Sequence, residues 1–216
     1  MNKFLESVHF RHACKLFDET KKIPKETFEE ILEVGRLAPS SFGMEPTRLL
    51  VLRSDEAKAA LRPLCWNQVQ ITSASEVVVF KTLQSDLVPP SEYAKQNTLR
   101  RKMDLSGYDV FCNRLGGHLQ ARGFVDDKIA HWSALQAYIM ATYMVAYASY
   151  LKIDTCYIEG FEKCKVEELY GLDPFKEQVA LIVCFGYRGK EQQPRFRISL
   201  DEFGIQIRES LYARYN

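Results

Sequence analysis

The spacing of hydrophobic and polar positions predicts two amphipathic helices at the start of the chain. Between Ile23 and Leu37, apolar residues recur at intervals of three and four, and glutamates fill the first turns. This spacing places the apolar side chains on one helical face, and Pro39 then stops the helix. Residues 2–9 show a shorter pattern of the same kind. We therefore expect two helices before the chain reaches its first strand.

Short apolar runs predict the strands of a buried sheet. They cover residues 49–52, 77–80, 155–158 and 179–185. Each run is short and bounded by polar or turn residues, as buried strands are. Because helical segments alternate with these runs, the chain is expected to be an α+β or α/β protein.

Shorter helices are expected between the strands. Asp55 is expected to cap a helix that runs to about Leu64, since aspartate is a favoured N-cap residue. Asn67 is expected to open a helix that ends near Ser75, and a further helix is expected over residues 162–170.

A long helix is predicted over residues 126–152; its middle is apolar on nearly every face, and residues 137–151 are the longest apolar run of the chain. It is too short in its apolar part to span a bilayer. A helix apolar on all faces must be covered on all faces, so we expect part of it to pack on a second subunit. Its tyrosines are interpreted as core and interface residues; they are Tyr138, Tyr143, Tyr147 and Tyr150.

Two segments lack a clear period. Residues 83–125 contain Pro89-Pro90 and Gly116-Gly117 as breakers, so we expect irregular, exposed helices that form a mobile lid. The tail, residues 200–216, is rich in aromatic and aliphatic side chains and is expected to pack on the partner subunit. No linker divides the chain, so residues 1–216 are expected to form one domain.

Composition excludes several classes of protein. The chain has 216 residues, 46% hydrophobic and 26% charged, and its net charge of +1 argues against a nucleic-acid-binding protein. Its six cysteines form no C-x-x-C pair and no zinc-binding spacing, so we expect free thiols, no metal and a reducing cytoplasm. No secretory signal is visible, and neither a G-x-G-x-x-G nor a Walker A sequence occurs.

A basic cluster near the N-terminus is the first candidate for chemistry. Arg11-His12-Ala13-Cys14-Lys15 places three nitrogen-bearing side chains in five residues, at the edge of an apolar stretch. Such a cluster could hold an anion or stabilise negative charge on a bound ring. Short basic clusters are also commonly solvated surface, so the cluster alone leaves both interpretations open.

Further motifs follow this cluster in a fixed order. They are Ala38–Pro46 (A-P-S-S-F-G-M-E-P), Trp66-Asn67-Gln68 with Ala74–Val79, Trp132 with Gln136 and Tyr138, Ile158–Phe161 (I-E-G-F), and Gly186–Arg188 with Arg195–Arg197. Together with Arg11–Lys15 they resemble the FMN-dependent nitroreductase family, most closely bacterial NAD(P)H nitroreductases and flavin reductases. The resemblance extends to about Arg197 and is poorest near residues 83–125. It implies an α+β fold with a mostly antiparallel central sheet, flanking helices, a long central helix and an intertwined homodimer.

The resemblance implies an FMN site at the dimer interface. Arginines would hold the phosphate, because guanidinium forks match its oxygens. Lys15 and Asn67 would face the pyrimidine edge of the ring, Glu159-Gly160 would lie near N5, and the loop around Ser40 would come from the other subunit. His12 is interpreted as structural. The implied cofactor-binding residues are Arg11, His12, Ala13, Lys15, Pro39, Ser40, Ser41, Gly43, Asn67, Gln70, Ile158, Glu159, Gly160, Arg195 and Arg197.

Three positions depart from the family pattern. Gln70 stands where relatives often place a second lysine, which changes the charge near the ring and hence its redox potential. Thr47 replaces a tryptophan, and Cys14 replaces a hydroxyl residue. A redox role for Cys14 is the less favoured interpretation.

The implied activity is a two-electron transfer by a ping-pong mechanism. NAD(P)H would pass hydride to flavin N5, and a nitroaromatic, a quinone or free flavin would then be reduced. No side chain is needed as a nucleophile, because the chemistry belongs to the cofactor. Two alternatives stay open: an enone reductase or dehalogenase of the same fold, and a flavin-binding protein without activity.

Overall fold

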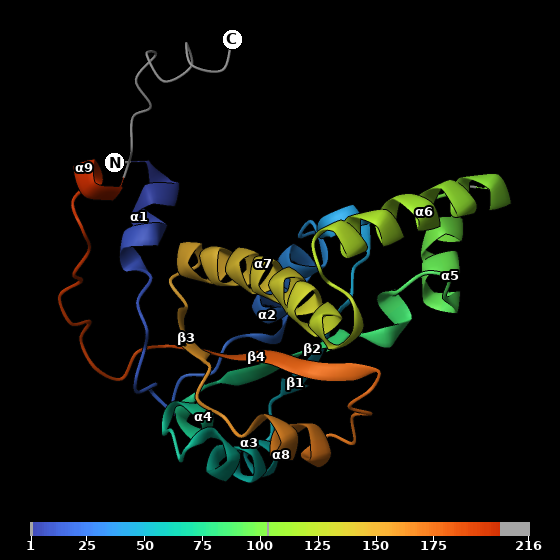
Figure 1. Ribbon diagram of the computed structural model, residues 1–216. Helices are drawn as coiled ribbons and strands as arrows, with labels where there is room; N and C mark the ends of the chain where they lie inside the picture. Colours follow the sequence, from blue (N-terminus) through green and yellow to red (C-terminus); the bar gives the residue numbers. More distant parts are fainter. Residues whose placement is uncertain (1, 103, 204–216) are drawn as a thin grey trace.

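The computed structural model describes residues 2–102 and 104–203 (Figure 1). The elements in chain order, with η for a 3-10 helix, are α1 (Lys3–Phe10), α2 (Lys25–Arg36), η1 (Ser41–Gly43), β1 (Thr47–Leu52), α3 (Asp55–Leu61), η2 (Arg62–Cys65), α4 (Gln70–Ser73), β2 (Glu76–Leu83), η3 (Ser85–Leu87), α5 (Glu92–Arg100), α6 (Leu105–Ala121), η4 (Asp126–Lys128), α7 (Ile129–Tyr150), β3 (Asp154–Ile158), α8 (Lys163–Leu169), β4 (Glu177–Gly186) and α9 (Leu200–Phe203).

The centre of the fold is a four-stranded sheet in the order β1-β2-β4-β3, with every neighbouring pair antiparallel. Helices α2 and α7 cover one face, and α3, α4 and α8 lie against the other (Figure 1). Helices α5 and α6 extend beyond one end of the sheet (Figure 1). The α+β class and the antiparallel sheet predicted for the chain are confirmed.

The central strands β2 and β4 contain continuous apolar runs, Val77–Phe80 and Val179–Phe185, because both faces of the sheet are buried. In β2, Val77 and Val79 pack among the residues under α3, α4 and α8. The alternate residues Val78 and Phe80 pack under α2 and α7. Successive side chains of a strand point to opposite faces, so a strand covered on both sides needs a continuous apolar run.

Helix α7 is the long helix that the apolar segment predicts, and α2 packs on it along the sheet. Gly35 of α2 allows this approach, since a Cβ at that position would lie 2.7 Å from the sulfur of Met144. One stripe of α7 is not covered by the part of the chain that the structure describes. Its exposed apolar side chains are Leu135, Ile139, Tyr143 and Tyr150. The second subunit expected to cover this stripe stays a prediction.

The segment over residues 83–125 is more regular than its glycines and prolines suggest. Helix α6 runs through Gly116-Gly117 without interruption. The reason is packing, because Phe111, Leu115 and Leu119 lie on one helical face and are buried in a third apolar cluster. The expectation of an irregular helix is therefore wrong for α6, although the side chains outside this buried face are exposed or partly exposed. Whether the segment moves as a lid stays a prediction.

Two helix starts differ from the expected positions. Ser54, and not Asp55, caps α3: its hydroxyl accepts the Ala57 N–H at 3.2 Å. Asn67 opens no helix, because its φ is 53° and α4 begins only at Gln70. A residue with left-handed backbone angles cannot belong to the first turn of a right-handed helix.

The C-terminal tail falls largely outside the described residues. Only α9 and the chain leading to it are described, so the expected packing of residues 200–216 on a partner stays a prediction. Among the described residues, no helix combines the length and apolar character that crossing a bilayer needs.

Candidate functional site

The basic cluster runs beside the edge strand β3. After α1 ends, Ala13 pairs with Thr155 in a parallel bridge, and the Cys14 N–H donates to the Thr155 carbonyl at 3.0 Å. Side chains in this extended segment alternate, so Cys14 is buried in the core while Lys15 is exposed. The backbone contact with β3 thus fixes Lys15 on the outer side.

Arginines far apart in sequence meet at the end of α1. The Arg195 guanidinium donates to the carbonyls of Val8 at 3.0 Å, His9 at 3.1 Å and also Arg11. Burial lowers the pKa of Arg11, and the nearby charges of Arg195 and Arg197 lower it further. Three like charges held together are typical of sites that bind an anion with several oxygens.

A polar network joins three of the predicted site segments. The Lys15 Nζ lies 3.8 Å from the Cys156 Sγ, and the Gln70 Nε2 lies 4.0 Å from the same sulfur. Gln70 also donates to the Gln68 Oε1 at 3.1 Å, and Gln68 donates to the Gly160 carbonyl at 2.9 Å. Lys15, Gln70 and Gly160 therefore lie around one centre.

Cys156 marks the middle of this region. Burial raises the pKa of its thiol, and the nearby charges of Lys15 and Arg11 lower it to a smaller extent. Because both cations act on one buried sulfur, the arginine cluster and Lys15 belong to the same part of the molecule. The thiol is neutral at physiological pH and adds no negative charge there.

The turn after β3 is packed against Trp66. The Trp66 and Asn67 residues are both left-handed, with φ of 52° and 53°, and Trp66 is 68% exposed. A Cβ at residue 160 would lie 2.6 Å from the Trp66 ring, so Gly160 is required for this contact. The result is an exposed aromatic ring lying on a backbone segment without a side chain.

Glu159 is tied to the long helix α7. The Tyr138 hydroxyl donates to the Glu159 Oε1 at 2.5 Å. Burial, and then the neighbouring Glu159 carboxylate, raise the pKa of Tyr138 to about 12. Tyr138 therefore stays a proton donor at neutral pH and orients the glutamate. Ile158, the residue before it, is buried in the core.

His12 supports the site from the side. Its Nδ1 lies 3.4 Å from the Asp154 Oδ1, and Arg188 pairs with the same oxygen at 2.7 Å. Burial lowers the pKa of His12, and the Arg188 charge lowers it further. The neutral imidazole therefore leaves Arg188 as the ionic partner of Asp154.

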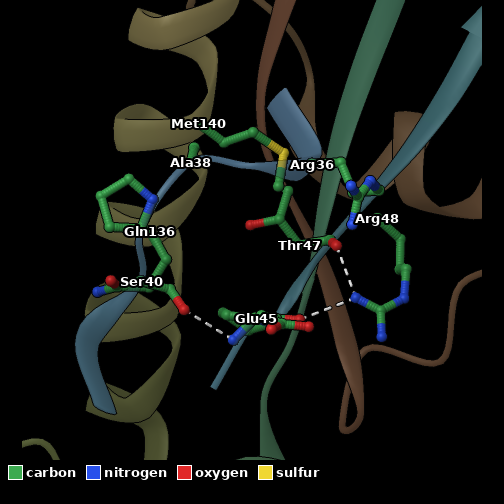
Figure 2. A pocket seen from close by; sticks show the side chains of 10 residues that line it. Arg36, Ala38, Ser40, Glu45, Thr47, Arg48, Gln136 and Met140 are labelled. Atoms are coloured by element: carbon green, nitrogen blue, oxygen red, sulfur yellow. Dashed lines mark hydrogen bonds between the residues drawn. The ribbon is translucent and has the colours of Figure 1, made fainter. Parts of the chain in front are cut away.

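The loop around Ser40 lies apart from these residues. A pocket of about 90 Å³ lies between this loop and α7. Ser40, Gln136 and Met140 are among the residues that line it (Figure 2). The Ser40 Oγ accepts the Glu45 N–H at 2.9 Å (Figure 2). The Ser41 N–H donates to the Gln136 Oε1 at 2.8 Å.

The two groups of predicted residues line different cavities of the chain. His12, Ala13 and Lys15 line one of about 420 Å³ with Val69 and Lys190. Pro39, Ser40 and Ser41 line another of about 420 Å³ with residues of α6 and α7. One chain therefore does not bring the two groups together.

Some members of the site were not predicted from the sequence. Gln68 and Cys156 join the network, and Tyr138 holds Glu159. Gln68 and Tyr138 lay within quoted motifs, and their place beside site residues was the available signal. For Cys156 the sequence offered no such signal, because its contact with Lys15 joins residues 141 positions apart.

The chain combines an antiparallel α+β fold with a cluster of arginines beside its edge strand. The Nitroreductase family model matches residues 8–187, so the chain belongs to the nitroreductase family, a family of oxidoreductases. The predicted family and the prediction of an enzyme are confirmed.

Relatives agree with this assignment. A Staphylococcus epidermidis protein with the provisional name NAD(P)H nitroreductase is 35% identical over 87% of this chain and 88% of its own length. A nitroreductase family protein of Streptococcus pneumoniae superposes with a TM-score of 0.75, at 26% identity over 95% of this chain and 100% of that one. A provisionally named nitroreductase of Exiguobacterium sibiricum, solved in complex with FMN, has a TM-score of 0.74 at 24% identity and covers 94% and 97% of the two chains.

Proposed function

We propose that this nitroreductase-family chain binds FMN and transfers electrons from NAD(P)H to nitroaromatics, quinones or free flavin. The observation that carries the proposal is the convergence of Arg11, Arg195 and Lys15 on one side of the edge strand. The FMN in the Exiguobacterium sibiricum structure supports it, because that protein shares the fold.

The arginines would hold the FMN phosphate. Arg195 is already fixed by the carbonyls at the end of α1, so its position costs no further ordering. The Arg11 side chain forms no hydrogen bond or ion pair with the described residues, and its charge is opposed by its neighbours. A phosphate dianion would relieve that repulsion, which is the physical fit between this cluster and the cofactor.

The network around Cys156 would hold the polar edge of the ring. Lys15 supplies the positive charge that favours electron density on the ring, and Gln70 supplies an amide donor without charge. Asn67, exposed beside Trp66, would contact the same edge. With one cation where relatives often have two, the bound flavin would have a lower reduction potential than in those relatives.

Bound FMN would supply the acceptance and donation of hydride. The chain itself would orient the flavin and leave one face of its ring accessible. Gly160 presents backbone without a Cβ, Tyr138 holds the neighbouring Glu159, and the Trp66 ring forms a wall beside the face. No side chain acts as a nucleophile in this proposal.

The complete site would need two subunits. Pro39, Ser40, Ser41 and Gly43 would reach the flavin held by the partner, which explains why one chain keeps them apart from Lys15. Tyr143 and Tyr150 of the exposed apolar stripe line a cavity of about 660 Å³ together with the exposed Phe4 of α1. The stripe and Phe4 would form the dimer interface.

An acceptor panel tests the proposed activity. Initial rates with NADH or NADPH would be measured against a nitroarene, a quinone, free flavin and an enone. We expect turnover of the first three and parallel double-reciprocal plots, as a ping-pong mechanism requires. Turnover of the enone alone would instead support an enone reductase. Purified protein that holds no FMN and gains no activity from added FMN would refute the proposal.

A further inference from the structure

The backbone that carries Ser40 and Ser41 has an unusual conformation. Phe42, Gly43 and Glu45 all have positive φ, at 53°, 57° and 49°. Left-handed non-glycine residues are uncommon and cost about 1 kcal/mol or more each, so they persist only where the surroundings hold them.

Helix α5 supplies the contacts that hold this loop. The Tyr93 hydroxyl lies 2.7 Å from the Met44 carbonyl and 2.8 Å from the Glu45 carbonyl, and donates to one of them at a time. Asn97 Nδ2 donates to the Gly43 carbonyl at 3.2 Å. Contacts from one helix thus reach three successive carbonyls of the loop.

Arg101, which follows the last residue of α5, completes the set. Its guanidinium donates to the Phe42 carbonyl at 2.7 Å and also to the Gly43 carbonyl. Its Cζ lies 5.3 Å from the centre of the buried Phe111 ring, so α6 holds the guanidinium in place. A Cβ at residue 43 would lie 2.7 Å from the Arg101 Nη2, so glycine is needed there for room as well as for φ.

The spacing of the residues that donate to the loop carbonyls lets them act together. Tyr93, Asn97 and Arg101 recur every four residues, which places them on one side of the helix. Asn97 is only 2% exposed, and its Oδ1 has no hydrogen-bond partner among the described residues. The oxygen and the nitrogen of a buried amide are usually both hydrogen-bonded. In Asn97 only the Nδ2 is, so the bond to the Gly43 carbonyl is the contact that this buried amide supplies to the described residues.

We propose that Tyr93, Asn97 and Arg101 form a carbonyl clamp that positions the FMN-facing loop, residues 40–45. The clamp acts through the backbone, so its members are positioning residues. It also joins α5 and α6 mechanically to the flavin: a displacement of that helical pair moves Ser40 and Ser41. This inference rests on the proposed function, because it gives the loop its role at the FMN site.

Hydrogen exchange tests whether the clamp holds the loop. Four amides of the loop are hydrogen-bonded, at Ser41, Gly43, Met44 and Glu45. In the purified protein, Arg101→Met should raise their exchange rates about tenfold, and Arg101→Lys should restore at least half of the protection. Arg114→Met is the matched control, since exposed Arg114 of α6 has no hydrogen bond or ion pair through its side chain within the described part of the chain. Unchanged exchange in Arg101→Met would overturn the clamp.

FMN affinity tests whether the clamp matters for the cofactor. The dissociation constant, measured by quenching of flavin fluorescence, should rise about tenfold in Arg101→Met, recover in Arg101→Lys and stay unchanged in Arg114→Met. Faster exchange with an FMN affinity within twofold of wild type would overturn the positioning role. Failure of the proposed function is distinguishable, because the wild-type protein itself would then bind no FMN.

Discussion

At Arg11, burial and the neighbouring positive charges both lower the pKa of the guanidinium. Burial and the charges of Arg195 and Arg197 all oppose its ionised form in the folded chain. A side chain held against such opposition is more informative about a ligand than an exposed arginine, because the cost is offset only when an anion arrives.

Replacing Arg11 should therefore separate binding from stability. In Arg11→Met we expect the FMN dissociation constant to rise at least tenfold, since a charge-assisted hydrogen bond contributes about 1.5–3 kcal/mol. The melting temperature of the FMN-free protein should not fall, because the substitution removes repulsion. Lys165→Met, at an exposed site paired only with Glu162, is the control. A variant that loses stability while keeping FMN affinity would show that Arg11 is structural.

Cys14 raises a different question, because its position in the basic cluster suggested reactivity. Burial raises the pKa of its thiol to about 11. The thiolate is the reactive form, so at pH 8 only about one molecule in a thousand carries it.

Alkylation at pH 8 followed by mass spectrometry should label exposed Cys164 and leave Cys14 unmodified. Because the thiolate fraction rises tenfold per pH unit below the pKa, any labelling of Cys14 should increase between pH 8 and 10. Labelling of Cys14 as fast as Cys164 at pH 8 would support the redox role.

The residues of the site were only partly predictable from the sequence. Arg11, Lys15 and Gly160 lie in motifs whose order along the chain indicated the family. The contact between Arg195 and the α1 carbonyls joins residues 184 or more positions apart, and no local pattern reports it. The clamp was missed for the same reason, because Asn97 and Gly43 belong to segments that pair only in the fold.

At the scale of elements, hydrophobic periodicity predicted the helices and strands whose apolar faces pack in the sheet layers. The strands and helices α2 and α7 follow from it, because their apolar faces lie in the two main clusters. Helix α6 was hidden by Gly116-Gly117. Local propensity disfavours glycine in a helix, but the burial of Leu115 and Leu119 outweighs that cost.

This account of α6 predicts the effect of a glycine substitution. A Cβ at Gly116 would meet no atom within 4 Å. Gly116→Ala should therefore raise the free energy of unfolding by about 0.5–1 kcal/mol, measured by urea denaturation, because alanine is the better helix former. Gly43→Ala is the opposite control and should destabilise, since residue 43 has positive φ and little room. A destabilised Gly116→Ala would contradict a continuous α6.

At the scale of the whole molecule, the proposed FMN site needs more than one chain. Six of the predicted FMN residues line two separate cavities, with His12, Ala13 and Lys15 on one and Pro39, Ser40 and Ser41 on the other. Helix α7 also leaves an apolar stripe exposed among the described residues. The proposed dimer would account for both observations: two copies would pack along α7, and each would lend its Ser40 loop to the other. The sequence indicated this assembly only through a helix apolar on all faces and through the family resemblance.

A charge placed on the stripe should break this assembly. Tyr143 is 47% exposed on α7, and Tyr143→Asp should convert the dimer into a monomer at micromolar concentration. FMN should be lost with it, because the partner's loop leaves. Phe175→Asp is the matched control, at an aromatic residue that is 83% exposed outside the stripe. Sedimentation velocity, followed at the flavin absorbance, would report the association state and the bound FMN together. A dimeric Tyr143→Asp that retains FMN, or a monomeric wild type, would contradict the proposed interface.

The central claim is that this chain positions a flavin for reduction by a nicotinamide nucleotide. The most direct test is an anaerobic titration of the purified, FMN-loaded protein with NADH and with NADPH, followed by absorbance at 450 nm. The account predicts that one equivalent of at least one nucleotide bleaches the flavin, and that a nitroarene or quinone then restores the colour. A flavin that stays oxidised with both nucleotides, or a protein that binds none, would contradict it.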